Sequence, residues 1–299
     1  MKTIRFEVTV NCKLPFSQEI RPYADAGLIM LPNSYSDTGE PTRLIINCHG
    51  AGGTVTTNDS QVEHQEFTRY FLANGYAVMD TNGLPYQLAE EFGIDLRNNI
   101  GSPIAVDCYV SAYHYCMEHF NLKPDVFVHG GSMGGISSTN LVLSERIPVI
   151  ANSALCPVLD AYNQVFLHPW SGGLPKTAEG ILYSFDKDEN GEWIYDAGKL
   201  KGFDPMTSTK KHPCPVWFCH SENDDIVNPE YTKIYIARAK AQGVDAQILL
   251  FPDGLHEPQT YGDPVKDPDG IAVLDGEEIT INLAIESAFR WIRKHEPTT

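Results

Sequence analysis

Residues 125–135 read DVFVHGGSMGG, a short apolar run that ends in a cluster of glycines around Ser132. The apolar run is rich in β-branched and aromatic residues, which predicts a buried strand. The glycines match the pattern Gly-x-Ser-x-Gly, and a helical pattern follows directly at residues 134–144. A turn this sharp crowds the backbone around the serine, so small neighbours let its hydroxyl project into the open. A glycine-rich structural turn is the alternative interpretation, and the strand before and the helix after argue against it.

Outward from this stretch, short apolar runs alternate with helical patterns. This alternation is typical of an α/β fold, with a mostly parallel central sheet and helices on both faces. Apolar residues at every second position of residues 4–10, followed by a short apolar run at residues 27–31, predict an N-terminal antiparallel hairpin. The other predicted strands lie at residues 44–48, 76–80, 125–129, 149–155, 216–220 and 246–251. The predicted helices lie at residues 61–73, 104–120, 134–144, 230–242 and 279–294.

The chain has 299 residues, and we expect a single domain over residues 1–299 because single α/β domains reach this length. Residues 160–210 break the alternation with aromatic side chains amid Gly and Pro, which predicts a cap-like insertion over the sheet edge that carries the serine. In this insertion we expect Trp170, Trp193 and Tyr195 to contact the substrate, because aromatic faces suit sugar rings and aryl groups. The alternative is that these side chains only pack the insertion against the body of the domain.

The formal net charge is −17, from 22 Lys and Arg against 39 Asp and Glu. Because phosphate binding requires a positive field, we expect neither a nucleic-acid partner nor an anionic membrane partner. No signal peptide and no apolar run of about 20 residues is visible, so we expect a soluble protein, cytoplasmic by default. The seven cysteines are odd in number and scattered through apolar runs, which predicts reduced core residues, not disulfides or a zinc site.

A second glycine-rich loop, in residues 46–53 with the sequence INCHGAGG, leaves the predicted strand before it. Consecutive small residues free backbone N–H groups to point at a substrate oxygen. We therefore expect an oxyanion hole from the N–H groups of Ala51 and Gly52, completed by Met133, the residue after the serine. His49 is interpreted as a structural residue that orders the loop, with a catalytic base as the alternative. The loop lacks the Gly-Lys-Ser/Thr ending of a phosphate-binding P-loop.

A serine at such a turn needs a base, and the base needs an orienting carboxylate. Asp224 and His256 each follow a predicted strand of the second half of the chain. The carboxyl ends of parallel strands meet at one edge of a sheet, so we expect both residues at the edge that carries Ser132. Asp225 is the second candidate for the carboxylate.

Over about residues 40–295 the chain resembles the α/β-hydrolase-fold serine hydrolases, nearest to their esterase and prolyl-oligopeptidase-like branches. The motifs that carry the resemblance are, in the order of the family, HGAGG, GGSMGG, HSENDDIVNP and DGLHEP. The acid motif of the family usually reads H-G-x-x-D-x-x-V-P, and this chain has Ser in place of the glycine and Asn in place of the final proline. The resemblance implies that Ser132 is the nucleophile, His256 the general base and acid, and Asp224 the orienting partner.

The resemblance also implies a reaction, namely hydrolysis of a carboxylic ester through an acyl-enzyme, without a cofactor or a metal. An acylated carbohydrate or a small acyl or aryl ester is the favoured substrate. The alternatives are a small single-domain peptidase of the prolyl-oligopeptidase-like branch and a non-catalytic binding module on the same fold. Residues 186–191, DKDENG, resemble the first half of an EF-hand calcium loop, although a hairpin turn at Asn190 and Gly191 explains them without a metal.

Overall fold

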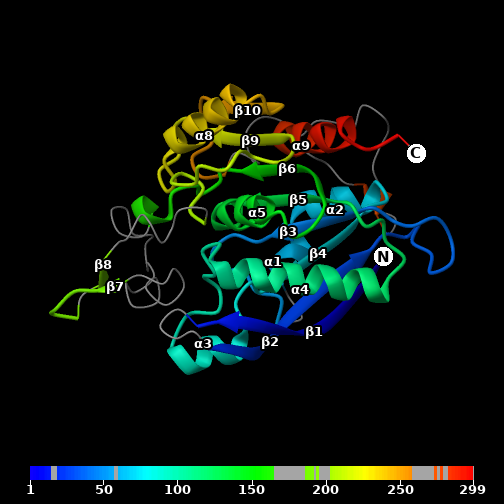
Figure 1. Ribbon diagram of the computed structural model, residues 1–299. Coiled ribbons are helices and arrows are strands. Elements are labelled where there is room, and N and C mark those ends of the chain that lie inside the picture. Colours follow the sequence, from blue (N-terminus) through cyan, green and yellow to red (C-terminus); the bar gives the residue numbers. More distant parts are fainter. Residues whose placement is uncertain are drawn as a thin grey trace.

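The computed structural model describes residues 1–14, 19–56, 60–164, 186–191, 193–194, 203–257, 273–274, 277–278 and 282–298. Its centre is an eight-stranded sheet with the strand order β1-β2-β4-β3-β5-β6-β9-β10 (Figure 1). The strands are β1 (Lys2–Lys13), β2 (Ile20–Leu31), β3 (Leu44–Cys48), β4 (Ala77–Thr81), β5 (Val126–Gly131), β6 (Val149–Leu155), β9 (Val216–Ser221) and β10 (Ala246–Phe251).

Most of this sheet is parallel. β1 pairs with β2 and β2 pairs with β4 in antiparallel fashion, whereas every pair from β4 to β10 is parallel. The predicted α/β fold and its N-terminal hairpin are therefore confirmed. The hairpin is longer than predicted, because its ladder runs without interruption from the pair Lys2 and Leu31 to the pair Lys13 and Ile20, past the apolar runs.

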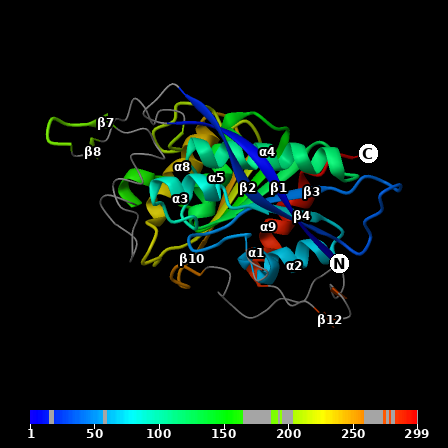
Figure 2. The ribbon, with the colours of Figure 1, turned by 90° about the horizontal axis from the view of Figure 1, so that it is seen from below.

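Helices cover both faces of the sheet. Successive side chains of β5 point to opposite faces, and each packs against a different set of helices. Val128 packs in one apolar cluster with residues of α4 and α5, while Phe127 packs in another with residues of α2 and α9. Figure 2 shows α4, α5 and α8 on one side of the sheet and α1, α2 and α9 on the other. The helices are α1 (Gln61–His64), α2 (Glu66–Ala73), α3 (Tyr86–Phe92), α4 (Pro103–His119), α5 (Met133–Ser144), α8 (Pro229–Ala241) and α9 (Leu283–Lys294).

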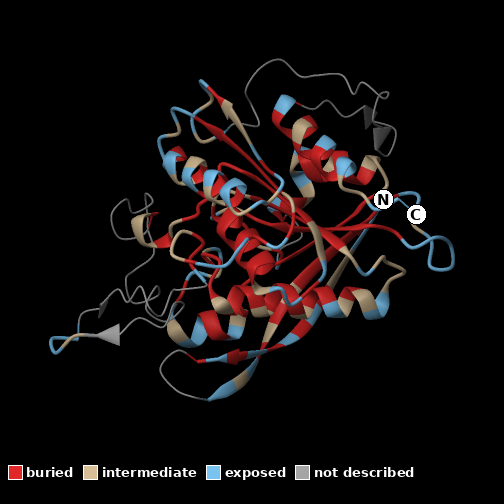
Figure 3. Cartoon of the chain, turned by 45° about the horizontal axis from the view of Figure 1, so that its top comes forward, coloured by how far each residue is buried: buried red, intermediate tan, exposed pale blue. Residues whose placement is uncertain are grey.

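Two helical features differ from the prediction. The helix predicted at residues 61–73 is two helices, because Gln65 between them has an extended backbone with ψ 133°. α3 was not predicted: it is only seven residues long, with two buried residues, and ends at Gly93 in the left-handed region. Neither change affects the core, which Figure 3 shows as a buried sheet between helices with exposed outer faces.

Part of the predicted insertion at residues 160–210 lies within the described residues. β7 (Asp186–Lys187) and β8 (Trp193–Ile194) pair as a small antiparallel hairpin, and Gly191, at φ 81°, donates its N–H to the carbonyl oxygen of Asp188 at 3.0 Å. The hairpin interpretation of residues 186–191 is thus confirmed. Trp170 and Tyr195 lie outside the described residues, and only the backbone of Trp193 is described.

A second small hairpin pairs β11 (Val273–Leu274) with β12 (Glu277–Glu278). Among the helices that the structure describes, none has the length and apolar character needed to cross a membrane.

Candidate active site

Ser132 occupies the turn between β5 and α5. Its backbone has φ 54° and ψ −122°, in a region that L residues adopt at a cost of about 1–3 kcal/mol. Two hydrogen bonds to the neighbouring strand and the loop after it hold the turn: the N–H of Ser132 donates to the carbonyl oxygen of Leu155, and its own carbonyl accepts from the N–H of Val158, both at 2.9 Å. The serine is therefore presented by a strained but well-anchored backbone.

The glycines of the motif are required by close backbone contacts. A Cβ at Gly134 would lie 1.8 Å from the carbonyl oxygen of Cys48, and one at Gly130 would lie 2.3 Å from the carbonyl oxygen of Gly134. Gly131 is different, since the nearest atom to its Cβ would be a carbonyl oxygen 4.0 Å away. Gly130 and Gly134 thus bring α5 directly against β5 and β3.

The structure brings Ser132, His256 and Asp224 into one hydrogen-bonded row. Nε2 of His256 lies 2.8 Å from Oγ of Ser132, and Nδ1 lies 2.8 Å and 3.1 Å from the two carboxylate oxygens of Asp224. The alternative carboxylate, Asp225, is exposed and makes no hydrogen bond to His256 within the described part of the chain. An imidazole between a hydroxyl and a carboxylate is the arrangement that activates a serine as a nucleophile.

Asp224 is held as a carboxylate by its donors. Oδ1 accepts the backbone N–H groups of Ile226 at 2.9 Å and Val227 at 2.8 Å. Burial by itself would raise the pKa of Asp224, but hydrogen bonds from His220, His256 and Val227 outweigh it and hold that pKa well below the ordinary value. For His256, burial acts to lower the pKa, and the hydrogen bond and charge of Asp224 outweigh it and raise that pKa.

His220, for which the sequence predicted no role, contacts the acid. Its ring is fully buried, with Nε2 3.0 Å from Oδ2 of Asp224 and Nδ1 2.8 Å from the hydroxyl of Thr232. The threonine hydroxyl is positioned to donate to Nδ1, which leaves the proton on Nε2 for the carboxylate. The signal was present, because His220 is the first residue of the acid motif.

The loops that carry the acid and the histidine are tied to each other by Asn223. Its side-chain Nδ2 donates to Oδ1 of Asp253 at 2.7 Å, and its side-chain Oδ1 accepts the N–H of Leu255 at 3.1 Å. Leu255, next to His256, has φ 50°. The position of His256 therefore depends on a residue of the neighbouring loop.

Cys156 contacts His256. It follows β6, donates its thiol to the carbonyl oxygen of His256 at 3.4 Å, and donates its N–H to the carbonyl oxygen of Cys219 at 2.7 Å. All seven cysteines are free and buried, as predicted. Cys156 is nevertheless more than core packing, because it borders the hydrogen-bonded row.

The predicted oxyanion loop lies against the serine turn. A Cβ at Gly50 would lie 3.6 Å from Cβ of Ser132. In the part of the chain that the structure describes, the N–H groups of Ala51 and Met133 have no acceptor. The expectation for Gly52 needs correction, because its N–H donates to the carbonyl oxygen of Arg97 at 3.2 Å and is not free for a substrate in this arrangement.

His49 has the structural role expected of it. Its ring is buried, with Nδ1 3.2 Å from Oδ1 of Asp80. The same carboxylate accepts the amide of Asn47 at 2.7 Å and the hydroxyl of Tyr109 at 3.2 Å. This network fixes the start of the oxyanion loop to the centre of the sheet.

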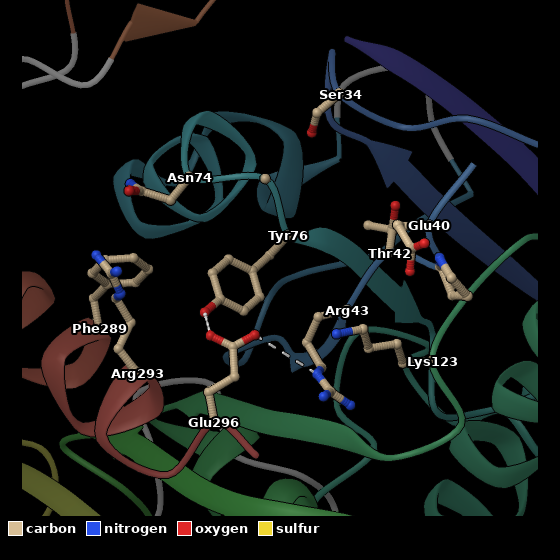
Figure 4. A pocket seen from close by; sticks show the side chains of 12 residues that line it. Ser34, Glu40, Thr42, Arg43, Asn74, Tyr76, Lys123, Phe289, Arg293 and Glu296 are labelled. Carbon is tan, nitrogen blue, oxygen red and sulfur yellow. Dashed lines mark hydrogen bonds and ion pairs between the residues drawn. The ribbon is translucent and has the colours of Figure 1, made fainter. Parts of the chain in front are cut away.

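A pocket of about 480 Å³ lies at the amino ends of β3 and β4, at the opposite end of the strands from Ser132 (Figure 4). Figure 4 shows Arg43 and Tyr76 directed toward Glu296, which accepts the tyrosine hydroxyl at 2.9 Å. Arg43 is buried and also pairs with Asp125 at 2.5 Å. Glu296 follows α9, so its contacts with Tyr76 and Arg43 attach the C-terminal end of this helix to the sheet, far along the strands from Ser132.

No family model matches the chain. It is 23% identical over 231 residues to the acylamino-acid-releasing enzyme of Arabidopsis thaliana, an alignment that covers 75% of this chain and 29% of that protein. The chain therefore spans less than a third of the length of this relative.

Solved structures with similar folds include the acylaminoacyl peptidase of Pyrococcus horikoshii, with a TM-score of 0.62 and 13% identity over 85% of this chain and 37% of that one. S-formylglutathione hydrolase FrmB of Staphylococcus aureus has a TM-score of 0.56 and 17% identity, over 86% of this chain and 93% of its own. Both are serine hydrolases with the α/β-hydrolase fold. The protein has the α/β-hydrolase fold, as the sequence resemblance implied.

Proposed function

We propose that the protein is a serine hydrolase that cleaves carboxylic esters through an acyl-enzyme on Ser132. The observation that carries the proposal is the row Ser132, His256 and Asp224, with hydrogen-bond distances of 2.8 Å on both sides of the imidazole. This row stands at the end of a strained strand-to-helix turn, where a nucleophile is presented to the substrate.

In the proposed reaction, Oγ of Ser132 attacks the ester carbonyl while Nε2 of His256 takes its proton. Asp224 accepts the Nδ1–H and stabilises the imidazolium that forms. The N–H groups of Ala51 and Met133 bind the oxyanion, each contributing about 2.7–4 kcal/mol by analogy with other hydrolases. His256 then returns the proton to the alcohol that leaves, and water releases the acid by the same steps.

The test is hydrolysis of p-nitrophenyl acetate together with labelling by a fluorophosphonate. Ser132→Ala is expected to lower turnover by at least about 10,000-fold and to abolish labelling. A Ser132→Ala variant with near wild-type turnover would remove this residue from its role. Folded wild-type protein that neither turns over the ester nor takes the label would favour the non-catalytic binding module.

A peptidase acting on N-acylated amino acids is the second candidate, favoured by the similarity to the acylamino-acid-releasing enzyme. An N-acetylamino-acid p-nitroanilide and the matching p-nitrophenyl ester differ only in the bond that is cleaved. A kcat/KM for the anilide that is comparable to that for the ester would support the peptidase. Cleavage of the ester alone would support the esterase.

Among esters, we propose an acylated carbohydrate or a small acyl or aryl ester as the substrate. The support is the aromatic content of residues 160–210, in which Trp170, Trp193 and Tyr195 are the proposed contacts. A panel of acetylated sugars, feruloyl esters and short p-nitrophenyl esters tests this, and equal rates on all of them would contradict a carbohydrate preference.

A further inference from the structure

We propose that Cys156, His256 and Asp224 form a binding site for a zinc-like divalent cation, and that a cation bound there switches the hydrolase off. The binding part stands on the geometry of the three side chains. The inhibitory part rests on the proposed hydrolase function.

The three side chains offer one ligand atom each, and these atoms all lie within 4.8 Å of one another. Ligand atoms on a single tetrahedral zinc lie about 3.3–3.6 Å apart. The longest distance between two of the three ligand atoms therefore has to shorten by no more than about 1.5 Å. The histidine is the partner able to move, because it lies in the loop that follows β10 and its side chain is 17% exposed. Cys156 and Asp224 are the fixed partners, buried at the ends of neighbouring strands.

The donor set selects the class of metal. A thiolate, an imidazole nitrogen and a carboxylate oxygen suit Zn²⁺ and Co²⁺, whereas Mg²⁺ prefers oxygen ligands alone. Three protein ligands leave the fourth tetrahedral position for a water molecule. Metal binding transfers the proton of the Cys156 thiol to solvent, and the new bonds join the metal to Sγ, to the imidazole nitrogen and to the carboxylate.

A metal on Nδ1 of His256 puts the remaining ring proton on Nε2. Without a metal, Nδ1–H faces Asp224 at 2.8 Å and Nε2 is free to accept the proton of Ser132. With the metal in place, Nε2 carries a hydrogen and donates toward the serine oxygen instead. The histidine then has no lone pair for the serine proton, and its link to Asp224 runs through the metal, so the nucleophile is not activated.

The site is tested first without any measurement of activity, with Co²⁺ as the probe. Wild-type protein is expected to develop a thiolate-to-cobalt charge-transfer band on titration, and Cys156→Ser is expected to lack it. Cys116→Ser is the matched control, since Cys116 is also a buried free thiol but lies in α4. Cys156→Ala serves as a second variant if the serine variant fails to fold. A band that survives in a folded Cys156 variant, or no band in wild-type protein, overturns the proposal.

Inhibition is tested with Zn²⁺ on p-nitrophenyl acetate hydrolysis, each variant being compared with its own metal-free rate. Changing the hydrogen-bond partner of a metal ligand costs about 10- to 100-fold in affinity, so loss of the ligand Cys156 should raise the inhibitory zinc concentration at least about 100-fold. Mg²⁺ should not inhibit, and a chelator should restore the rate. Equal inhibition of wild-type protein and Cys156→Ser overturns the proposal. A Cys156-dependent cobalt band in a protein without esterase activity would instead refute the proposed function and leave the metal site standing.

Discussion

His129, in the strand that leads to Ser132, makes folding sensitive to acid. The ring is 1% exposed, packs 4.5 Å from the ring of Phe67 and has Nδ1 2.7 Å from the hydroxyl of Ser153. Burial lowers the pKa of His129 from 6.5 to about 3. In the unfolded chain the imidazole keeps its ordinary pKa, so between these values the unfolded state binds more protons and stability falls as the pH falls. Between about pH 7.5 and about pH 4.5 the free energy of unfolding falls by about 3 kcal/mol. The reason is that about pH 4.5 lies about two pH units below the ordinary pKa, and each unit costs about 1.4 kcal/mol.

The perturbation is His129→Phe, which keeps an aromatic ring and removes the titrating group. Urea unfolding at the two pH values gives the loss of stability for each protein, and the loss should be smaller by about 3 kcal/mol in the variant. The loss of the bond to Ser153 lowers stability at both pH values and cancels in the comparison. His114→Phe, on the exposed side of α4, is the control. An equal loss in wild-type protein and His129→Phe would refute the reasoning.

Three further predictions concern the site itself, each read by the rate of fluorophosphonate labelling. Gly134→Ala should lower both the labelling rate and the melting temperature, because its Cβ would lie 1.8 Å from a carbonyl oxygen, whereas Gly131→Ala, with 4.0 Å of space, should be tolerated. Asn223→Ala should slow labelling about tenfold with little change in melting temperature, since it unties the histidine loop, and Asp225→Ala next to the acid should not slow it. His220→Phe should slow labelling by about 10- to 100-fold, the worth of one hydrogen bond to a charged group, and a wild-type rate would show that Asp224 needs no such donor.

The backbone of the site could be predicted from the sequence because its steric demands limit the residues allowed. Gly130 and Gly134 are needed where chain segments meet at distances that admit no Cβ. A pattern of this kind is visible in one sequence, together with the apolar strand before it. The order of motifs along the chain then predicted that Asp224 and His256 would reach Ser132, and the hydrogen bonds show that they do.

The supporting side chains of Asn223 and Cys156 could not be predicted, because their partners are set by which loops the fold brings together. Asn223 contacts residues 30 and 32 positions away in sequence, and Cys156 contacts a residue 100 positions away. The free N–H of Gly52 was wrongly expected for the same reason. Its acceptor, the carbonyl of Arg97, belongs to a loop after α3, a helix that the sequence pattern did not predict.

Sheet topology explains why the residue that follows β6 contacts His256. The strand order β5-β6-β9-β10 places β6 between the strand that leads to Ser132 and the strand that leads to Asp224. The histidine loop, which follows β10, must cross the end of β9 to reach the serine, and so His256 comes to lie over the end of β6. The side chain at position 156 therefore reaches the histidine, here through Sγ of Cys156. A thiol at this position gives the contact a chemistry that a hydrocarbon would lack, because it adds a metal ligand to a histidine and a carboxylate already joined at 2.8 Å.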